Sequence, residues 1–301
     1  MKIFLTGHLG YVGSILAKQL LKENFEITGY DVGYFTQESE NKISSKIIFI
    51  KKDLRNVIKD DLKGCDAVLH LAALSNDPLG ELNSSLTHDI NYSQTVKLAK
   101  LAKESGVEKF IFSSSCSTYG ASKEIVNETS HLSPITAYAK SKVDSEYEIL
   151  KLKGEQFYPV ILRSATAYGM SPNLRLDLVV NNLVCSAFTT GKVKLLSDGT
   201  AWRPLVHVED MANAFITVLK ASQEKTSGET FNVGSNEENY TVKQIAETVQ
   251  DIVPNSTIEY AQDSNKDART YRVDFSKIKN QIGYKTNWKL KDGIQEIYNQ
   301  I

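Results

Sequence analysis

The sequence predicts an α/β protein: a doubly wound parallel sheet with helices on both faces, accompanied by a smaller mixed α/β domain. In the first half of the chain, short apolar runs typical of strands alternate with helical patterns, as in parallel βαβ units. A glycine-rich turn joins the first strand to the first helix, and the alternation weakens beyond residue 167. Because ligands bind outside the carboxyl ends of such strands, we expect functional residues there.

The individual elements follow from hydrophobic periodicity. Strands are expected at 2–5, 26–30, 67–71, 109–112 and 159–163, and helices at 11–23, 91–104 and 137–152. Segments rich in Pro, Asn and Gly, such as 171–173 and 197–199, then indicate loops and short elements. A helix at 210–221 and a strand at 229–233 can rejoin the sheet. We therefore expect a first domain over 1–166, rejoined by about 207–232, and a smaller discontinuous domain within 167–301.

Composition excludes several classes of partner. The 301 residues carry 35 basic and 36 acidic side chains, so no basic field attracts nucleic acid or an anionic membrane. The three cysteines have no Cys-x-x-Cys spacing, which favours reduced thiols in a cytoplasmic protein. No His, Cys or carboxylate cluster has the spacing of a metal site. The apolar run at the N-terminus is too short for a signal peptide, and no later run approaches a membrane span.

The turn after the first strand has the spacing of a phosphate-binding loop. It reads Gly7-His8-Leu9-Gly10-Tyr11-Val12-Gly13, and missing side chains let the backbone approach a pyrophosphate at a helix N-terminus. The second strand ends at Asp31, where a carboxylate can accept hydrogen bonds from both hydroxyls of an adenosine ribose. No arginine or lysine occurs in 32–37 to receive a 2′-phosphate. These features predict a Rossmann-like domain that binds NAD.

A tyrosine and a lysine lie four residues apart on the helix expected at 137–152. Tyr138 and Lys142 therefore share one helix face. A free phenol has a pKa of about 10, and a neighbouring cation lowers that pKa by favouring the phenolate. Tyr138 can then take a proton from an alcohol. The pair alone is also compatible with an ordinary surface aromatic and lysine.

These motifs together resemble the extended short-chain dehydrogenase/reductase family, in its NAD-dependent nucleotide-sugar epimerase/dehydratase branch. The resemblance covers nearly the whole chain and includes, besides the glycine loop and the Tyr138/Lys142 pair, His70-Leu71-Ala72-Ala73, Ser113-Ser114-Ser115, Leu162-Arg163 and residues 203–210 and 231–234. It implies a Rossmann-like doubly wound parallel sheet with a smaller mixed α/β substrate-binding domain. It also implies NAD as cofactor, a nucleotide-diphosphate sugar as substrate, and a homodimer formed through the helices at 91–104 and 137–152.

The resemblance assigns roles residue by residue. Ser115, Tyr138 and Lys142 would be catalytic. Asp53 would bond the adenine, and Asn91 would support the active-site helix. The implied cofactor contacts are Gly7, Leu9, Gly10, Tyr11, Val12, Gly13, Asp31, Asp53, Leu54, Leu71, Ala72, Ala73, Asn91, Tyr138 and Lys142. The implied substrate contacts are Ser75, Ser115, Tyr168, Asn173, Arg175, Asn182, Arg203 and Arg269.

Three of the arginines have a second interpretation. For Arg203 and Arg269, whose guanidinium groups suit phosphate oxygens, a surface salt bridge is the alternative. Arg175 and Asp177 are either sugar contacts or a salt bridge with one another. His207, just before a helix, and His70, at a strand end, are interpreted as structural.

Two residues after Ser115 differ from those of some family members, and the differences disfavour certain reactions. The family's 4,6-dehydratases hold an Asp and a Glu at the two places after the catalytic hydroxyl residue, where this chain has Cys116 and Ser117, so dehydration is disfavoured. Members that epimerise at carbons 3 and 5 hold a cysteine where this chain has Ser117. If side chains alternate across the strand end, the Cys116 thiol points elsewhere and is a small buried filler. Oxidation, reduction or epimerisation remains, at carbon 4 by expectation.

Three functional hypotheses follow. The first is an oxidoreductase or epimerase that keeps NAD bound, acting on sugars of bacterial surface polysaccharides, since residues 171–177 and 269–274 resemble enzymes of that kind. The second is a 4-keto-sugar reductase or heptose dehydrogenase that exchanges its cofactor. The third is a non-catalytic redox sensor, because a fold alone does not fix function. Sensors of this type usually lack the tyrosine and lysine that this chain has.

Overall fold

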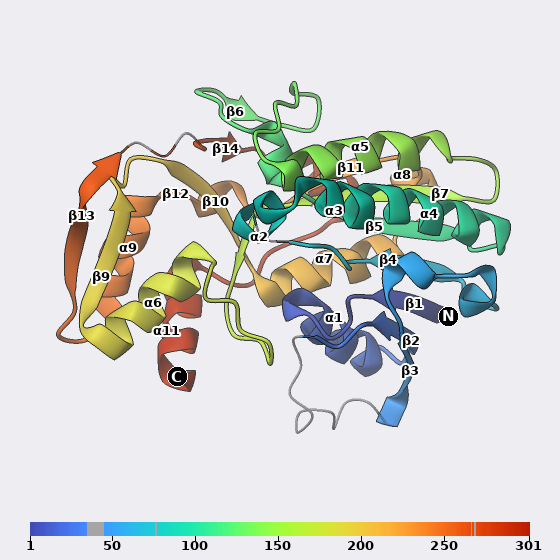
Figure 1. Cartoon of the computed structure of the whole chain (residues 1–301), viewed down its shortest axis with the longest axis horizontal. Coiled ribbons are helices and arrows are strands. Elements are labelled where there is room, and N and C mark those ends of the chain that lie inside the picture. The colour runs from blue at the N-terminus through green and yellow to red at the C-terminus, as the bar shows by residue number, and fades with distance from the viewer. Residues whose placement is uncertain (35–44, 76, 266, 268) are drawn as a thin grey trace.

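A seven-stranded parallel sheet forms the centre of the protein. The computed structural model describes residues 1–34, 45–75, 77–265, 267 and 269–301. Within those residues, the sheet has the strand order β11-β7-β5-β4-β1-β2-β3, visible across the right of Figure 1. Its strands are β1 (Lys2–Thr6), β2 (Glu26–Asp31), β3 (Ile47–Lys51), β4 (Ala67–His70), β5 (Lys109–Ser115), β7 (Tyr158–Ser164) and β11 (Thr230–Val233). All neighbouring strands run parallel, so their carboxyl ends share one edge.

Helices cover both faces of this sheet, as the alternating pattern predicted. One face packs against α1 (Tyr11–Lys22), α7 (Val208–Lys220) and α10 (Ser276–Ile282), and the other against α4 (Gln94–Glu104) and α5 (Ala137–Lys151). In Figure 1, α4 and α5 lie next to each other at the upper right, whereas α1 and α7 lie lower, near the middle of the view. Successive side chains of a strand point to opposite faces of the sheet, which produces two cores. In β1, Ile3 and Leu5 belong to the core on the α1 side, and Phe4 belongs to the core on the α4 side. The short helices α2 (Asp77–Leu82), α3 (Ser84–His88) and α8 (Gln223–Thr226) connect these layers.

Several boundaries differ from the sequence prediction for local reasons. The helix predicted at 91–104 begins with a π-helical stretch, Asp89–Ser93, which places the Asn91 side chain in the interior. Helix α7 starts at Val208, two residues before the predicted start, because the His207 ring accepts a hydrogen bond from the Glu209 backbone N–H and caps the helix. Strand β3 was not among the predicted elements.

The remaining elements form a smaller body with its own core, at the left of Figure 1. A three-stranded sheet contains β8 (Thr166–Tyr168), β10 (Trp202–His207) and β12 (Asn239–Thr241), and a pair contains β9 (Lys192–Ser197) and β13 (Thr257–Asn265). Three helices pack against them: α6 (Val179–Thr190), α9 (Val242–Ile252) and α11 (Leu290–Gln300). A short parallel pair, β6 (Ile125–Val126) and β14 (Arg272–Val273), lies at the top of Figure 1. Strand β11 pairs with β7, so the chain returns to the large sheet after entering the smaller body.

Candidate active site

The glycine loop forms a cradle that fits a pyrophosphate. A Cβ on Gly13 would lie 1.9 Å from the Gly7 carbonyl oxygen, so this position tolerates no side chain. Gly7 has a φ of +72°, and a Cβ there would lie 2.8 Å from the backbone nitrogen of Ala72. Gly10 precedes α1 without a side-chain cap, which leaves the first N–H groups of the helix available to bind an anion. The loop therefore fits the diphosphate of NAD.

Asp31 stands at the carboxyl end of β2, beside this loop. Its carboxylate accepts hydrogen bonds from the backbone N–H groups of Leu9 at 3.1 Å and Gly33 at 2.9 Å. These bonds fix the carboxylate near the loop, where an adenosine ribose would meet it. Asp53 is held differently, because three Arg55 N–H groups bond its carboxylate and lower the pKa of Asp53.

The end of β4 forms the second wall of the cradle. The Thr6 hydroxyl accepts hydrogen bonds from the N–H groups of Leu71 (3.2 Å) and Ala72 (3.1 Å). The buried His70 ring bonds Thr6 on one side, as expected of a structural residue. Asn91 exchanges two hydrogen bonds with the backbone of Leu74, so it fixes the loop that follows β4.

Tyr138 and Lys142 lie on the first two turns of α5. Lys142 is 3% exposed, and its ammonium lies 5.5 Å from the centroid of the Tyr138 ring and donates a 2.7 Å hydrogen bond to the Ser113 carbonyl. Burial lowers the pKa of Lys142 to about 7, and the nearby Glu146 carboxylate opposes that shift. Ser115 ends β5, and its hydroxyl accepts a 3.1 Å hydrogen bond from the Ser117 N–H. The carboxyl end of β5 thus meets the start of α5.

A segment of the second half crosses back over the cofactor loop. This crossing segment, residues 169–177, is tied to α1 through Tyr11, whose hydroxyl donates to the Gly169 carbonyl at 2.8 Å. A second bond runs the other way, because the Ser171 hydroxyl of the crossing segment donates to the Tyr11 backbone carbonyl at 2.6 Å. Asn181 on α6 bonds both the Tyr11 hydroxyl and the Gly169 N–H. The Tyr11 side chain therefore joins the two bodies, and its ring is buried.

The crossing segment continues toward the wall made by β4. The Asn173 amide donates to the Leu9 carbonyl in the glycine loop. The Arg175 guanidinium donates to the Ser75 hydroxyl at 3.2 Å and to the Ser75 carbonyl at 3.1 Å. It also forms a 2.6 Å ion pair with Asp177, which was one of the two interpretations of this pair. Three proposed substrate contacts, Ser75, Asn173 and Arg175, are thus gathered around the loops of the cofactor domain.

Other proposed substrate contacts lie further out. Arg203 and Arg269 both bond the Asp267 carboxylate, so they lie together as the diphosphate assignment requires, but in a salt-bridge arrangement. Asn182 donates to the Leu176 carbonyl at 2.8 Å, on the exposed side of α6. Tyr168 does not join this group. Its ring is 1% exposed in the core of the smaller body, because β8 directs it between α6 and α11.

The residues after Ser115 differ from the strand-end prediction. Strand β5 ends at Ser115, and the chain turns into a 3₁₀ helix, Cys116–Tyr119. The argument from alternation along a strand therefore does not apply to Cys116. The thiol is nevertheless buried and donates to the Arg163 carbonyl at 3.2 Å, and burial raises its pKa. Cys116 acts as a packing residue, and neither it nor Ser117 supplies a carboxylate.

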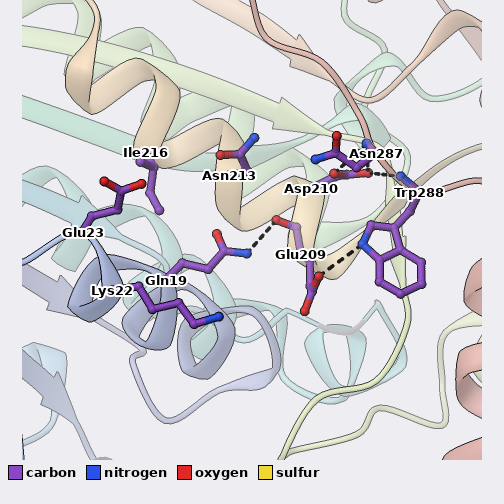
Figure 2. A pocket seen from close by; sticks show the side chains of 9 residues that line it. All are labelled: Gln19, Lys22, Glu23, Glu209, Asp210, Asn213, Ile216, Asn287 and Trp288. Carbon is purple, nitrogen blue, oxygen red and sulfur yellow. Dashed lines mark hydrogen bonds between the residues drawn. The ribbon is translucent and has the colours of Figure 1, made fainter.

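A depression between α1 and α7 contains none of the proposed site residues. Figure 2 shows its lining, in which Glu209 accepts hydrogen bonds from Gln19 and Trp288. His207 stacks on the same Trp288 with 3.9 Å between ring centroids, as expected of a packing and capping residue.

Among the described residues, no group of three or more His, Cys, Asp or Glu side chains has the arrangement of a metal site. No described helix has the length and apolar character needed to cross a bilayer.

Comparison with known proteins decides the family. Residues 3–234 match the NAD dependent epimerase/dehydratase family. This chain belongs to that family. The family is NAD-dependent, in agreement with the fit of the glycine loop and Asp31, and the resemblance to extended short-chain dehydrogenases/reductases is confirmed.

Relatives of this epimerase/dehydratase chain align over nearly its whole length. YtcB of Bacillus subtilis, described as an uncharacterized UDP-glucose epimerase, is 27% identical over 98% of this chain and 96% of its own. The UDP-glucose 4-epimerase of Corynebacterium glutamicum is 28% identical over 94% of this chain and 90% of its own. A dTDP-D-glucose 4,6-dehydratase of Homo sapiens is 27% identical over 98% and 88%.

Solved structures show the same fold. The UDP-glucuronic acid 4-epimerase from Bacillus cereus, in complex with UDP-glucuronic acid and NAD, superposes with a TM-score of 0.87 at 24% identity, covering 99% of this chain and 98% of the other. MoeE5, in complex with UDP-glucuronic acid and NAD, gives a TM-score of 0.87 at 23% identity, covering 100% and 99%. The Rossmann-like fold predicted from the sequence is therefore confirmed.

Two features of this epimerase/dehydratase site were not predicted from the sequence. The hydroxyl bond from Tyr11 to Gly169 joins residues 158 positions apart, and no local pattern reports it. Glu146 was also missed, although it lies four residues after Lys142 on the same helix face. That spacing was available as a signal, and Glu146 proves to be paired inside the protein with Arg163.

Proposed function

We propose that this chain is a nucleotide-sugar 4-epimerase that keeps NAD bound throughout turnover. One observation carries the proposal: the buried Lys142 ammonium lies 5.5 Å from the Tyr138 ring, at the strand end that carries Ser115. Relatives named UDP-glucose 4-epimerase match nearly the full chain and support the substrate class. When bound, NAD supplies a hydride acceptor for the sugar carbinol carbon and returns that hydride.

The protein groups then move one proton. Tyr138, as phenolate, takes the proton from the sugar hydroxyl while the Ser115 hydroxyl holds the same oxygen. The charged Lys142 stabilises the phenolate and bonds the nicotinamide ribose. On the return step, Tyr138 gives the proton back to the same oxygen. The sugar leaves with inverted configuration at that carbon and with no net change in composition.

The substrate would lie across the edge where the two bodies meet. Arg203 and Arg269 would bind the diphosphate, with the phosphate oxygens replacing the Asp267 carboxylate that both arginines now bond. Asn173 and Asn182 would help to hold the nucleotide. Residues Ser75 and Arg175 would contact the sugar. In this proposal the enzyme is cytoplasmic and acts on sugars of bacterial surface polysaccharides. Two copies of it form a homodimer through α4 and α5.

The crossing segment favours the epimerase over an enzyme that exchanges its cofactor. Its hydrogen bonds reach Leu9 and Tyr11 at the cofactor loop and Ser75 in the loop after β4, so release of the dinucleotide would require several of these bonds to open together. An epimerase must retain the reduced cofactor while the keto-sugar turns over. A 4-keto-sugar reductase or heptose dehydrogenase must let it leave.

A panel of nucleotide sugars tests the proposal. Purified protein, with no cofactor added, is incubated with GDP-, UDP-, dTDP- and CDP-sugars while NADH absorbance is followed and product configuration is determined by NMR. An epimer formed without added cofactor supports the epimerase. A product that requires added NAD or NADH selects the exchanging enzyme. Tight NAD binding with no turnover of any sugar selects the redox sensor.

A further inference from the structure

A buried ion pair lies behind the catalytic face of α5. Glu146, one turn beyond Lys142, receives three hydrogen bonds from Arg163: from Nε to Oε1 at 3.1 Å and to Oε2 at 3.0 Å, and from Nη2 to Oε2 at 2.6 Å. The two side chains are only 4% and 7% exposed. Removal of one partner of such a pair leaves an uncompensated charge inside the protein.

Neighbouring residues of one strand hold Lys142 and Glu146. The Ser113 carbonyl accepts the hydrogen bond from Lys142, and the next residue, Ser114, donates its hydroxyl to Glu146. Arg163 lies opposite Ser114 in the register of β5 and β7. Two successive turns of α5 are therefore attached to two successive residues of β5. This attachment fixes both the height and the rotation of the helix that carries Tyr138.

The bonds continue across the sheet from Arg163. Its Nη1 donates to the Tyr119 hydroxyl at 3.1 Å, and that hydroxyl donates to the Asn232 side chain on β11 at 2.7 Å. Each side-chain nitrogen of Arg163 therefore has a hydrogen-bond partner, and its charge is paired with Glu146. The Glu146 carboxylate is thus held by Arg163 and Ser114, one helical turn from Lys142.

The surroundings of Lys142 make Glu146 its main source of negative charge. On α5, Lys142 faces Tyr138 and Glu146. From β5 it faces the Phe112 ring at 4.6 Å and the Ser113 carbonyl. From β4 it faces His70, whose pKa burial lowers to about 3, so that imidazole is neutral at working pH. Burial lowers the pKa of Lys142 to about 7, and the Glu146 carboxylate acts against that shift.

We propose that Glu146 is a positioning residue that keeps Lys142 charged beneath Tyr138, and that Arg163 sets how much of the carboxylate's field reaches the lysine. The inference rests on the proposed roles of Tyr138 and Lys142. It predicts opposite effects on the charge of Lys142 when Glu146 or Arg163 is neutralised. Without the Glu146 charge, the Arg163 cation repels Lys142 with no carboxylate to offset it, and the ammonium is disfavoured. Without the Arg163 charge, the whole carboxylate acts on Lys142, and the ammonium is favoured.

Two single variants and their combination test this statement. Glu146→Gln and Arg163→Gln each leave one buried charge without its partner, so both lose stability. The double variant Glu146→Gln with Arg163→Gln removes both charges and keeps the fold measurable if a single variant unfolds. Glu238→Gln is the matched control, because Glu238 is as deeply buried as Glu146 but lies in the smaller body and accepts a bond from the Leu290 N–H.

The measurement is the affinity for NAD between about pH 6 and pH 9, by calorimetry, because a charged ammonium is the stronger donor to ribose hydroxyls. The midpoint of this pH dependence should fall by about one pH unit in Glu146→Gln and rise by a similar amount in Arg163→Gln. The double variant should lie between the two single variants. The Glu238→Gln midpoint should equal the wild-type value. Thermal unfolding of every variant is recorded beside it.

The direction of the shifts decides the outcome. Opposite shifts in the two single variants support the proposal, since a merely structural pair would loosen α5 in the same way from either side. Shifts of the same sign, or no shift, overturn it. If one single variant does not fold, the double variant is compared with the other single variant. A double-variant midpoint that lies closer to the wild-type value supports the proposal. Equal midpoints in the double variant and the folded single variant contradict it. This test measures NAD binding and needs no sugar substrate. A lack of sugar turnover would therefore contradict the proposed function but not the proposed role of Glu146.

Discussion

The Tyr11 hydroxyl donates a 2.8 Å hydrogen bond to the carbonyl oxygen of Gly169. Tyr11 opens the helix after the glycine loop, whereas Gly169 directly follows β8 of the smaller body. The bond is buried, and the same hydroxyl accepts a bond from the Asn181 amide. One phenolic oxygen at the cofactor loop therefore bonds both the crossing segment and α6 of the smaller body.

Tyr11→Phe should release NAD faster. The change removes the buried bonds to Gly169 and Asn181 and leaves the ring in place, and each lost bond costs about 1 kcal/mol. We expect dissociation of NAD to accelerate by about 5- to 30-fold, measured by stopped-flow displacement. Tyr284→Phe is the control, because Tyr284 is also buried and donates to the Asp210 carbonyl. Equal release rates in both variants would remove the crossing segment from cofactor retention.

Tyr138→Phe should abolish turnover while NAD stays bound. Only the phenolic oxygen is lost, and removal of a general base lowers kcat by about 10²- to 10⁴-fold. NAD content after gel filtration should match the wild type. Epimerisation of UDP-glucose is followed by NMR. An unchanged kcat would exclude Tyr138 as the base.

Lys142→Ala should weaken both NAD binding and catalysis. The ammonium is assigned to the nicotinamide ribose and to the Tyr138 phenolate, so one deletion affects both steps. Calorimetry with NAD and the rate of sugar turnover measure the two effects separately. Loss of turnover with full NAD affinity would show that Lys142 does not hold the cofactor.

Lys142→Met should change how stability depends on pH. Because burial lowers the pKa of Lys142 from 10.5 to about 7, the unfolded chain binds more protons than the folded one between those values. The lysine therefore destabilises the wild type most at and below about pH 7, and this penalty declines as the pH rises. Relative to the wild type, the variant should be more stable at pH 7 than at pH 10, measured by urea unfolding. A difference that does not vary with pH would contradict the burial of a titrating Lys142.

Asp31→Ala should reduce the preference for NAD over NADP. The carboxylate would accept bonds from the ribose hydroxyls of NAD and repel a 2′-phosphate. We expect the ratio of the two affinities to fall by about tenfold or more, since one bond to a charged group contributes about 1.5–3 kcal/mol. Asp60→Ala, an exposed carboxylate on the same domain, is the control. An unaltered ratio would remove Asp31 from cofactor selection.

The sheet could be predicted from the sequence because its signals are local. The apolar run at Ile3 and the glycine at Gly13 are read within a few residues, and parallel pairing then follows from the alternation. The smaller body could not be predicted in the same way. Its β9 and β13 pair Lys192 with Thr257, and such distant pairing leaves no periodic signal in a short window.

The site shows the same division. Tyr138 and Lys142 are one helical turn apart, and the sequence alone places them on one face. Tyr168 was assigned to the substrate because of its motif, yet its ring is buried in the smaller body, since the direction of β8 decides where it points. The partner of Glu146 could not be read from the sequence, because Arg163 comes from a different strand.

The return of the chain to the sheet also bears on synthesis of the protein. Strand β11, Thr230–Val233, is the outer neighbour of β7, and it is made only after β8, α6, β9 and β10. Domains ordinarily fold as units while the chain emerges from the ribosome. Here the dinucleotide domain stays incomplete at one edge until more than three quarters of the polypeptide has been translated. A nascent chain arrested before Thr230 would therefore expose β7 as an open, apolar edge, where a chaperone or a second nascent chain can bind.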